Sequence, residues 1–404
     1  MSDLMSEYSI ESPARTETAP PPSPSAVSRA TRGTMALFFA NGATFATWGV
    51  HIPTIKARFG LSDAMLSFAM LAVAAGAIVA MGPVGRWVAR LGSARASMIG
   101  GVAFALLTLA IIAMPSFALL LPTLLIFGMA NAAFDVGMNA QAAIVEASRT
   151  RPVMSALHGM FSLGGMIGAA FGGLMLSLGV PPLVHAALIA SLTAGVAIGM
   201  TPGLLADHPV LPTADHHREH ASRALWLLGL MAFLGLVGEG AMYDWTSVYM
   251  RDVVVAPLGW ISFGYAAFSG GMACGRFGGD RLRARFGDAR TLTGSAWLGF
   301  AGIVLAIAVP LPLAALIGFG LMGLGAANMV PIFFAAASRL PGVAAAEAIA
   351  RVARFAYVGL LLGPVLIGGV AHLSDLRIGI TVVALTMGYI ALFGAKAARR
   401  YLIT

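Results

Sequence analysis

The stretch Ala89-Arg-Leu-Gly-Ser-Ala-Arg95 recurs as Ala284-Arg-Phe-Gly-Asp-Ala-Arg290, with five identities in seven positions and a shift of 195 residues. The same shift carries Arg86 to Arg281. It also relates two sets of glycines: Gly128, Gly164, Gly168 and Gly173 in the first part of the chain, and Gly323, Gly359, Gly363 and Gly368 in the second. A heptapeptide and several glycines in one frame indicate an internal repeat. The sequence therefore predicts two structurally similar halves.

Both copies lie between long apolar runs, and the composition is apolar throughout. Hydrophobic residues make up 58% of the 404 residues and charged residues only 10%, against roughly 25% charged in an ordinary soluble domain. This excludes a soluble globular protein. The formal net charge is +8, but the basic residues are scattered and not clustered as nucleic-acid binding requires. The single cysteine, Cys274, allows neither a disulfide framework nor a thiolate zinc site.

Apolar runs of about the length of a membrane-spanning helix recur twelve times. Breaks at glycine, proline and charged residues place them near 34–55, 65–85, 96–114, 117–145, 153–177, 183–203, 225–250, 258–279, 291–310, 312–337, 346–370 and 377–396. The expected fold is an all-α integral membrane protein with 12 transmembrane helices in two pseudo-symmetric six-helix halves.

The basic residues orient these helices, because Lys and Arg concentrate on the cytoplasmic side of membrane proteins. With the N-terminus inside, 19 of the 25 Lys and Arg, Arg276 among them, fall on the cytoplasmic side. Lys56, Arg58, Arg251 and Arg377 fall outside, and Arg351 and Arg354 lie within the eleventh run. We expect a multi-pass protein of the bacterial inner membrane with both termini in the cytoplasm.

The apolar runs and their breaks divide the chain into five parts. A disordered cytoplasmic tail (1–33), rich in proline and serine, precedes the N-terminal six-helix half (34–203). A linker whose His, Asp and Pro content predicts a solvated cytoplasmic loop (204–224) leads to the C-terminal six-helix half (225–396) and a short cytoplasmic tail (397–404). Parallel halves are typical of one large class of transporters, which hold their substrate between the halves.

The repeated heptapeptide resembles the loop between the second and third spans of the major facilitator superfamily. In that loop a glycine, an acidic residue and several basic residues follow a helix end. The residues that fit are Gly85, Arg90, Gly92 and Arg95 in the first half and Arg285, Gly287 and Arg290 in the second. The usual acidic position holds Ala89 and Ala284 instead. The resemblance implies gating loops, and the alternative is that the arginines only anchor the chain at the membrane surface.

Five further stretches narrow the resemblance to the bacterial YbjJ/MosC-like subgroup, which is similar to the fucose-proton symporters. They are Phe39-Ala-Asn-Gly with Ala46-Thr-Trp48, Leu157-His-Gly-Met-Phe-Ser-Leu-Gly164, Glu239-Gly-Ala-Met-Tyr-Asp-Trp245, Gly275-Arg-Phe-Gly278 and Leu362-Gly-Pro364. The likeness extends over residues 34 to 396. It implies a secondary active transporter that works by alternating access, and it does not imply a substrate. The amides Asn41, Asn131 and Asn139 with Trp48 and Trp245 favour a small hydroxylated solute, of the sugar, polyol or inositol-amine type, and Asp135 favours proton-coupled symport.

Ionisable side chains inside a bilayer are costly and mark functional sites by default. Asp135 lies between Asn131 and Asn139 at intervals of four residues, which places all three on one face of the fourth span. We expect Asp135 to couple proton movement to transport, with Glu239 in the seventh span and His158 in the fifth as further proton-coupling residues. The alternative for each is a structural hydrogen bond between helices.

Amides, aromatic rings and charges in the spans are candidates for substrate contact. Aromatic faces stack on the C–H faces of sugars and polyols, while amides hydrogen-bond to hydroxyl groups. The expected substrate-binding residues are Asn41, Trp48, Asn131, Asn139, Tyr243, Asp244, Trp245, Asn328, Arg354 and Tyr357. Interfacial anchoring is the alternative for the tryptophans, and His51 is expected at the outer water boundary.

Two other functions stay open. They are a proton-driven exporter of drugs or amphipathic metabolites and a membrane solute receptor. No G-x-x-x-x-G-K-[ST] loop occurs, and the spans contain no signature of a paired nucleophile and base, so neither an ATP-driven pump nor an enzyme is expected. No cofactor and no metal is predicted. The expected partners are a small-molecule substrate, protons and the lipid bilayer, with no nucleic acid, and the chain is expected to be a monomer.

Overall fold

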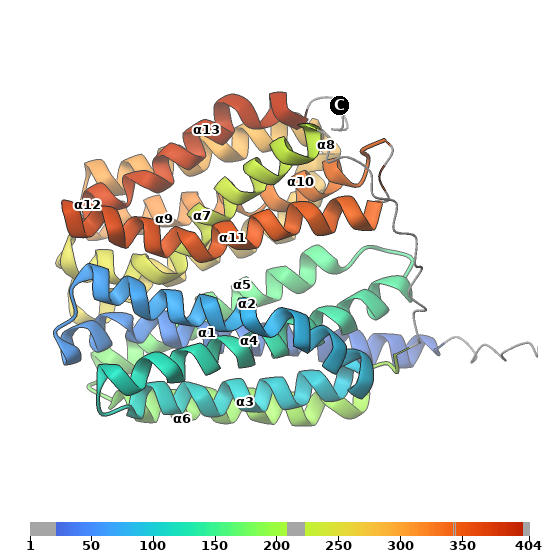
Figure 1. Cartoon of the computed structure of the whole chain (residues 1–404), viewed down its shortest axis with the longest axis horizontal. Coiled ribbons are helices and arrows are strands. Elements are labelled where there is room, and N and C mark those ends of the chain that lie inside the picture. The colour runs from blue at the N-terminus through green and yellow to red at the C-terminus, as the bar shows by residue number, and fades with distance from the viewer. Residues whose placement is uncertain (1–21, 208–222, 342, 344, 399–404) are drawn as a thin grey trace, which may run out of the picture.

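The computed structural model describes residues 22–207, 223–341, 343 and 345–398, and this part of the chain is helical without any strand. The helices are α1 (Pro24–Phe59), α2 (Asp63–Leu91), α3 (Ser93–Ala113), α4 (Phe117–Ala147), α5 (Met154–Ser177), α6 (Pro182–Met200), η1 (Thr201–Gly203), α7 (Arg223–Asp252), η2 (Leu258–Trp260), α8 (Phe263–Ala308), α9 (Pro312–Ala326), α10 (Met329–Ala337), α11 (Ala345–Leu373), α12 (Leu376–Gly379) and α13 (Thr381–Ala398). They form two bundles, α1 to α6 and α7 to α13 (Figure 1).

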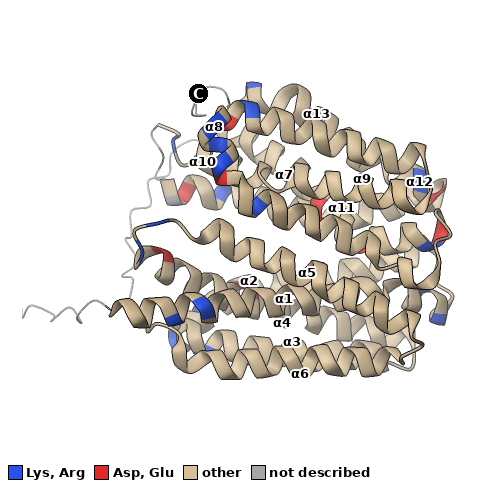
Figure 2. Cartoon of the chain, turned by 180° about the vertical axis from the view of Figure 1, so that it is seen from behind, with Lys and Arg blue, Asp and Glu red and all other residues tan. Residues whose placement is uncertain are grey.

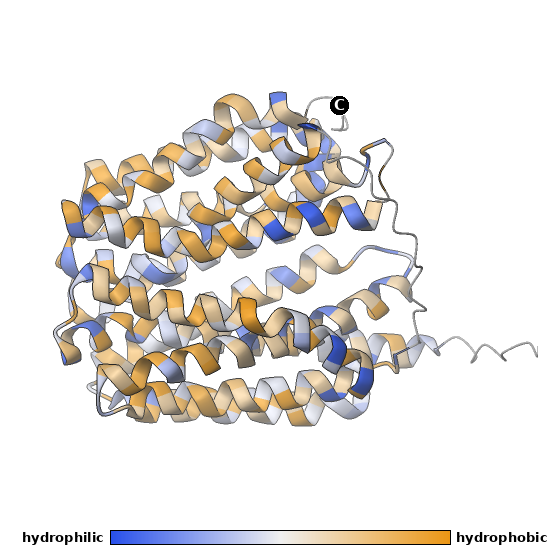
Figure 3. Ribbon diagram, in the orientation of Figure 1, coloured by the Kyte–Doolittle hydropathy of each residue, from blue (hydrophilic) through white to orange (hydrophobic). Residues whose placement is uncertain are grey.

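The described helices provide twelve membrane spans. Ten helical segments are long and apolar enough to cross a membrane. One of them contains α8, which bends at Gly287, where φ is 77° and ψ is 162°, so its two arms cross separately. The two arms of α8 count as two spans, which makes eleven. The long helix α1, with 36 residues, is the twelfth. Hydrophobic residues occupy most of their length, as the ribbon coloured by hydropathy shows (Figure 3). The expected all-α membrane fold is confirmed.

The 195-residue repeat reappears as close packing of helix backbones. Gly128 of α4 lies so near α2 that an added Cβ would be 1.9 Å from the carbonyl oxygen of Val73. In the other half, a Cβ on Gly323 of α9 would be 2.0 Å from the carbonyl oxygen of Phe268 in α8. Val73 and Phe268 are themselves 195 residues apart. Because only glycine permits this approach, the sequence repeat is a repeat of helix packing.

The first helix begins at Pro24, inside the stretch 1–33 that was expected to be a disordered tail. The Ser23 side chain accepts a hydrogen bond from the backbone nitrogen of Ala26, and proline suits the first helical turn. The polar residues of this turn explain why hydropathy alone misses it. Most of the expected tail (1–21), the linker segment 208–222 and residues 399–404 lie outside the described residues.

The two heptapeptides turn at glycines with positive φ, 85° at Gly92 and 77° at Gly287. An acidic residue nevertheless contacts each turn, from the start of the linker in the first half and from within the heptapeptide itself in the second. In the first half, Asp207 accepts hydrogen bonds from the backbone nitrogen and the hydroxyl of Ser93. In the second half, Asp288 stands at the repeat position of Ser93 and accepts hydrogen bonds from two arginines, Arg283 and Arg339.

The other residues of these loops point to water. Arg90, Arg95, Arg285 and Arg290 are exposed, and no atom lies within 4 Å of a Cβ added to Gly85. This placement suits anchoring at the membrane surface, and a gating role for these residues stays a prediction.

The start of α1 and the end of α13 lie at one end of the bundle, called here the terminal face, and the other end is the opposite face (Figure 1). Basic side chains gather at the terminal face (Figure 2). At the opposite face, charged groups join the two halves. Lys56 Nζ lies 2.6 Å from a carboxylate oxygen of Asp63 and 2.6 Å from one of Asp252, which ties α1 to α2 and α7. Arg251 donates a hydrogen bond to the carbonyl oxygen of Pro53.

Two glycine contacts complete the closure of the opposite face. A Cβ added to Gly368 of α11 would lie 1.5 Å from the hydroxyl oxygen of Ser67 in α2. A Cβ added to Gly173 of α5 would lie 2.3 Å from the hydroxyl oxygen of Ser262, which directly precedes α8. The two pairs are related by 195 residues, and each joins one half to the other. The halves therefore meet closely on both sides of the pseudo-symmetry axis.

Candidate functional site

Two connected cavities lie between the halves. The inner cavity, of about 240 Å³, is bordered by α1, α2, α4, α5, α7 and α11. The vestibule, of about 410 Å³, continues toward the terminal face past α5, α8 and α10. The residues common to both are Asp135, His158, Phe161, Glu239, Tyr357 and Leu360. The size suits a small molecule, and the closed opposite face leaves the terminal face as the way in.

One wall of the inner cavity is formed by α4. The spacing of four residues brings Asn131, Asp135 and Asn139 to this wall, as expected. Asn139 Nδ2 donates to the backbone oxygen of Asp135 at 2.9 Å and to its Oδ1 at 3.1 Å. Among the described residues, no cation is paired with Asp135. This carboxylate therefore has a neutral amide as its partner and faces an open cavity.

Asn41 of α1 lies beside this wall. Its Nδ2 is 3.6 Å from the sulfur of Met138, whereas its Oδ1 is buried and has no hydrogen-bond partner in the structure. A buried acceptor without a partner costs free energy. A ligand hydroxyl or amine that donates to Asn41 Oδ1 would remove that cost.

The facing wall belongs to α7, which presents Glu239, Tyr243 and Asp244 to the inner cavity. Glu239 Oε1 lies 3.2 Å from Arg276 Nη2 of α8, and both side chains are largely buried. Asp244 lies near the Trp48 side chain of the other half. Of the two acids of this wall, Glu239 is thus paired with a cation, whereas no ion pair of Asp244 is found among the described residues.

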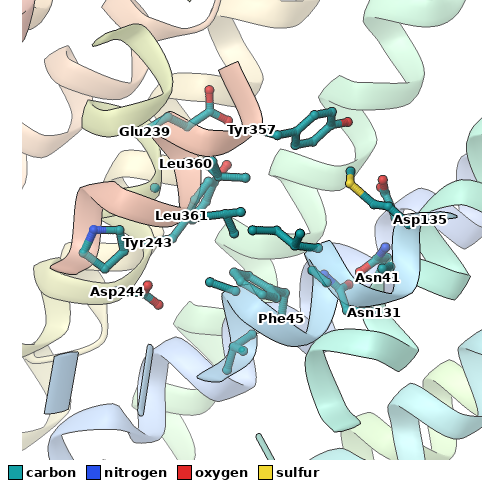
Figure 4. Close-up of a pocket in the computed structure, with 18 of the residues that line it drawn as sticks. Asn41, Phe45, Asn131, Asp135, Glu239, Tyr243, Asp244, Tyr357, Leu360 and Leu361 are labelled. Carbon is teal, nitrogen blue, oxygen red and sulfur yellow. The ribbon is translucent and has the colours of Figure 1, made fainter. Parts of the chain in front are cut away.

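Tyr357 and His158 stand near both walls. Tyr357 of α11 lines both cavities, and Figure 4 shows it between the carboxylates of Asp135 and Glu239. His158 of α5 also lines both cavities and packs edge-on against Phe38 with ring centroids 5.2 Å apart. Asp135, Tyr357, Glu239, Arg276 and His158 therefore form one polar group across the two halves.

One side of the inner cavity is aromatic. The Tyr243 ring lies 6.2 Å from Phe45, 6.3 Å from Phe161, 5.4 Å from Tyr265 and 5.0 Å from Phe268, measured between centroids. We call these five residues the aromatic floor, of which Phe45 and Tyr243 appear in Figure 4. Three members of the floor, Phe45, Phe161 and Tyr243, line the inner cavity and offer π faces to C–H groups.

Three of the expected substrate-binding residues lie elsewhere. Trp48 and Trp245 are buried inside the helix packing, and Trp245 Nε1 donates to the backbone oxygen of Pro364 at 3.0 Å. Arg354 is exposed in a groove on the outer surface between α7 and α11. The expectation that these side chains face the cavity is corrected, because the two tryptophans are enclosed in the helix packing and Arg354 lies on the outside of the bundle.

The last expected substrate residue, Asn328, lines the vestibule at the break between α9 and α10. His51 is also corrected, because it is fully buried and not at a water boundary. Its Nε2 is 2.9 Å from Nδ1 of His185 in α6.

Sequence reasoning missed Arg276, which it counted among the cytoplasmic anchors. The sequence does contain a sign that Arg276 lies deep in the membrane. It precedes the turn at Gly287 by eleven residues, which correspond to about 16 Å of helix. An arginine so far from a helix end needs a buried acid as its partner, and Glu239 is that acid.

The family model of the Major Facilitator Superfamily matches residues 34–294. The chain belongs to the major facilitator superfamily. An uncharacterised MFS-type transporter of Yersinia pestis is 34% identical over 368 residues, which are 90% of this chain and 94% of that protein. Membrane protein MosC of Rhizobium meliloti is 33% identical over 344 residues, 83% of this chain and 82% of MosC. The chain is thus a multi-pass membrane transporter and not an enzyme.

Solved structures of the superfamily share this fold. A bacterial homologue of the human lysosomal transporter Spinster, inward-facing and occupied, has a TM-score of 0.73 at 14% identity and covers 94% of this chain and 98% of its own. The nucleoside transporter NupG has a TM-score of 0.65 at 14% identity, covering 93% and 99%. FucP in its outward conformation has a TM-score of 0.62 at 16% identity, also covering 93% and 99%.

Proposed function

We propose that the protein is a proton-coupled symporter of a small hydroxylated solute, of the sugar, polyol or inositol-amine type, working by alternating access. The observation that carries this is the arrangement of carboxylates around the inner cavity. Asp135 on one half accepts a hydrogen bond from the amide of Asn139, Glu239 on the other half is paired with Arg276, and Tyr357 lines the same two cavities. A proton and a polar solute can thus meet in one space between the moving halves.

Asp135 is the proposed site of proton binding. A carboxylate without a cation is expensive to enclose in an apolar surrounding, so closing the halves around Asp135 favours its protonated form. Glu239 keeps a counter-charge in Arg276 and can stay ionised through the same movement. Tyr357 and His158 are proposed to link the two acids during proton transfer.

The amides and the aromatic floor are the proposed solute contacts. Asn41, Asn131 and Asn139 offer donors and acceptors on one wall, and the rings of Phe45 and Tyr243 offer apolar faces below them. NupG, a nucleoside transporter of the same fold, supports a hydroxylated solute. For Trp48, which does not line the inner cavity, we propose a positioning role beside Asp244 in place of substrate contact.

The topology is proposed on the basis of charge. Basic side chains gather at the terminal face (Figure 2), and such residues favour the cytoplasm. We propose accordingly that both termini are cytoplasmic and that the cavity is open to the cytoplasm in this conformation. An inner-membrane location and a monomeric state are proposed with it, since one chain supplies both halves around the cavity.

One observation favours a second candidate, a proton-driven exporter of amphipathic compounds. Much of the inner cavity wall is apolar, with Met70, Val73, Ile78 and Met81 from α2 and Leu361 from α11. Such a wall suits apolar ligand parts.

The test is proton movement in lightly buffered proteoliposomes during addition of inositols, inosamines, hexoses, nucleosides or amphipathic cations. For symport, solute entry alkalinises the outside medium, and Asp135→Asn lowers this signal at least about tenfold. Asp375→Asn, which changes an exposed carboxylate at the start of α12 where asparagine also caps a helix, serves as the matched control and keeps the signal. Proton exchange driven by cations would establish the exporter instead. Solute binding without flux would indicate a receptor, and solute flux without proton movement would refute coupling by Asp135.

A further inference from the structure

A groove of about 520 Å³ runs along the outer surface between α7 and α11, away from the inner cavity. We call it the outer groove. Its walls and rim are formed by Trp226, Phe233, Arg351, Arg354, Phe355 and Val358. Trp226 is 56% exposed and Val358 45% exposed, so the groove faces the surroundings of the bundle. Since the chain spans a membrane, those surroundings include lipid.

Arg354 is the charge in this groove that requires explanation. It lies nine residues after the start of α11, about 13 Å along the helix axis, and its side chain is exposed. Within the described part of the chain, Arg354 has no ion pair or hydrogen bond, whereas its neighbour Arg351 pairs with Glu347. A guanidinium at this depth on a lipid-facing surface is costly unless an anion or the interface compensates it.

The other side chains of the groove suit the remainder of a phospholipid. Trp226 lies three residues after the start of α7, and tryptophans prefer the headgroup level of a membrane. Its ring meets that of Phe355 at a centroid distance of 4.8 Å. Phe233 and Val358 continue the apolar surface of the groove along the helices. Basic pockets between transmembrane helices are known to accept anionic headgroups.

We propose that the outer groove binds an anionic phospholipid, with the headgroup phosphate on Arg354 and an acyl chain along the apolar wall. Guanidinium matches the geometry of phosphate through two parallel hydrogen bonds. The site is separate from the inner cavity and does not depend on the proposed transport function. Both sites use α11, which also presents Tyr357 to the inner cavity. A lipid bound in the outer groove would therefore contact a helix that moves during transport.

The experiment uses the purified full-length protein in detergent, titrated with phosphatidylglycerol and followed by native mass spectrometry. Arg354→Gln is expected to weaken binding about tenfold. Arg86→Gln, which changes an exposed arginine of α2 outside the groove, is the matched control and binds as the parent does. Val358→Trp fills the groove while the guanidinium stays, and it is expected to weaken binding as well. Size-exclusion profiles confirm that each variant is folded.

Three outcomes would overturn the proposal. Equal binding of phosphatidylglycerol by Arg354→Gln and Arg86→Gln would show that Arg354 does not hold the headgroup. Equal affinity for phosphatidylcholine in the parent protein would show that the groove does not select anionic lipid. Displacement of the lipid by inorganic phosphate at millimolar concentration would show that Arg354 binds a soluble anion and not a lipid headgroup.

Discussion

Arg276 and Glu239 show how much depends on single side chains in an apolar protein. Their charged atoms are 3.2 Å apart in the wall of the inner cavity, and each neutralises the other. Removing one partner of a buried pair leaves an uncompensated charge, which costs about 3 to 5 kcal/mol, whereas removing both is often nearly neutral. The pair therefore allows a test that separates stability from transport.

We expect Arg276→Gln to lower the melting temperature of the purified protein and to abolish solute uptake. The double variant Arg276→Gln with Glu239→Gln is expected to regain most of the melting temperature but not the uptake, because the charge pair also serves transport. Thermal unfolding and proteoliposome uptake, measured on the same preparations, give both quantities. Recovery of uptake in the double variant would contradict a transport role for the pair.

At the level of helices, glycine contacts set how closely the elements approach. Gly368 of α11 and Gly173 of α5 press against Ser67 and Ser262 of the other half. Small residues allow such close approach between helices in membranes. The next residue, Gly369, has no atom within 4 Å of an added Cβ, which makes it a natural control.

Gly368→Val is expected to prevent closure of the opposite face, since its side chain would overlap both Ser67 and Trp245. The accessibility of the inner cavity to reagents added at the opposite face should therefore rise about tenfold. The measurement is the alkylation rate of Phe45→Cys in a Cys274→Ser background, with an impermeant reagent applied at the opposite face. Gly369→Val carries the same change of helix propensity and should leave the rate unaltered. Equal rates in the two valine variants would show that the Gly368 contact does not control closure.

The helices were largely predictable from sequence, whereas their rotations were not. The repeat of Gly128 and Gly323 predicted two halves, and their packing confirms it. Trp48 and Arg276 were misplaced because helices apolar on every side give no periodicity that marks the cavity face. Asp135 lined the cavity as expected, because two asparagines at intervals of four residues marked one face.

At the scale of the whole molecule, Lys56 joins the halves across the opposite face. It contacts Asp63 of its own half and Asp252 of the other, and its side chain is 13% exposed. Partly buried pairs are screened less by salt than surface pairs. The Lys56 bridge therefore favours the conformation that is open at the terminal face.

Lys56→Gln is expected to shift the molecule toward opening at the opposite face, by about fivefold in population for a contribution near 1 kcal/mol. Spin labels at Ala113→Cys and Leu311→Cys, again in a Cys274→Ser background, report the distance across that face. The longer distance should gain population in Lys56→Gln but not in the control Lys396→Gln. Identical distance distributions would mean that Lys56 does not favour closure of that face.

The 195-residue symmetry ends at the inner cavity, which bears on the history of the protein. Asp135 has Val330 as its repeat counterpart, His158 has Ala353, and Arg276 has Met81. The glycine contacts, in contrast, occur in both halves. The simplest order of events is a gene duplication that fixed the scaffold, followed by divergence that gave each copy its own polar residues. Each ancestral half then contained the framework of a transporter before either contained a finished binding site.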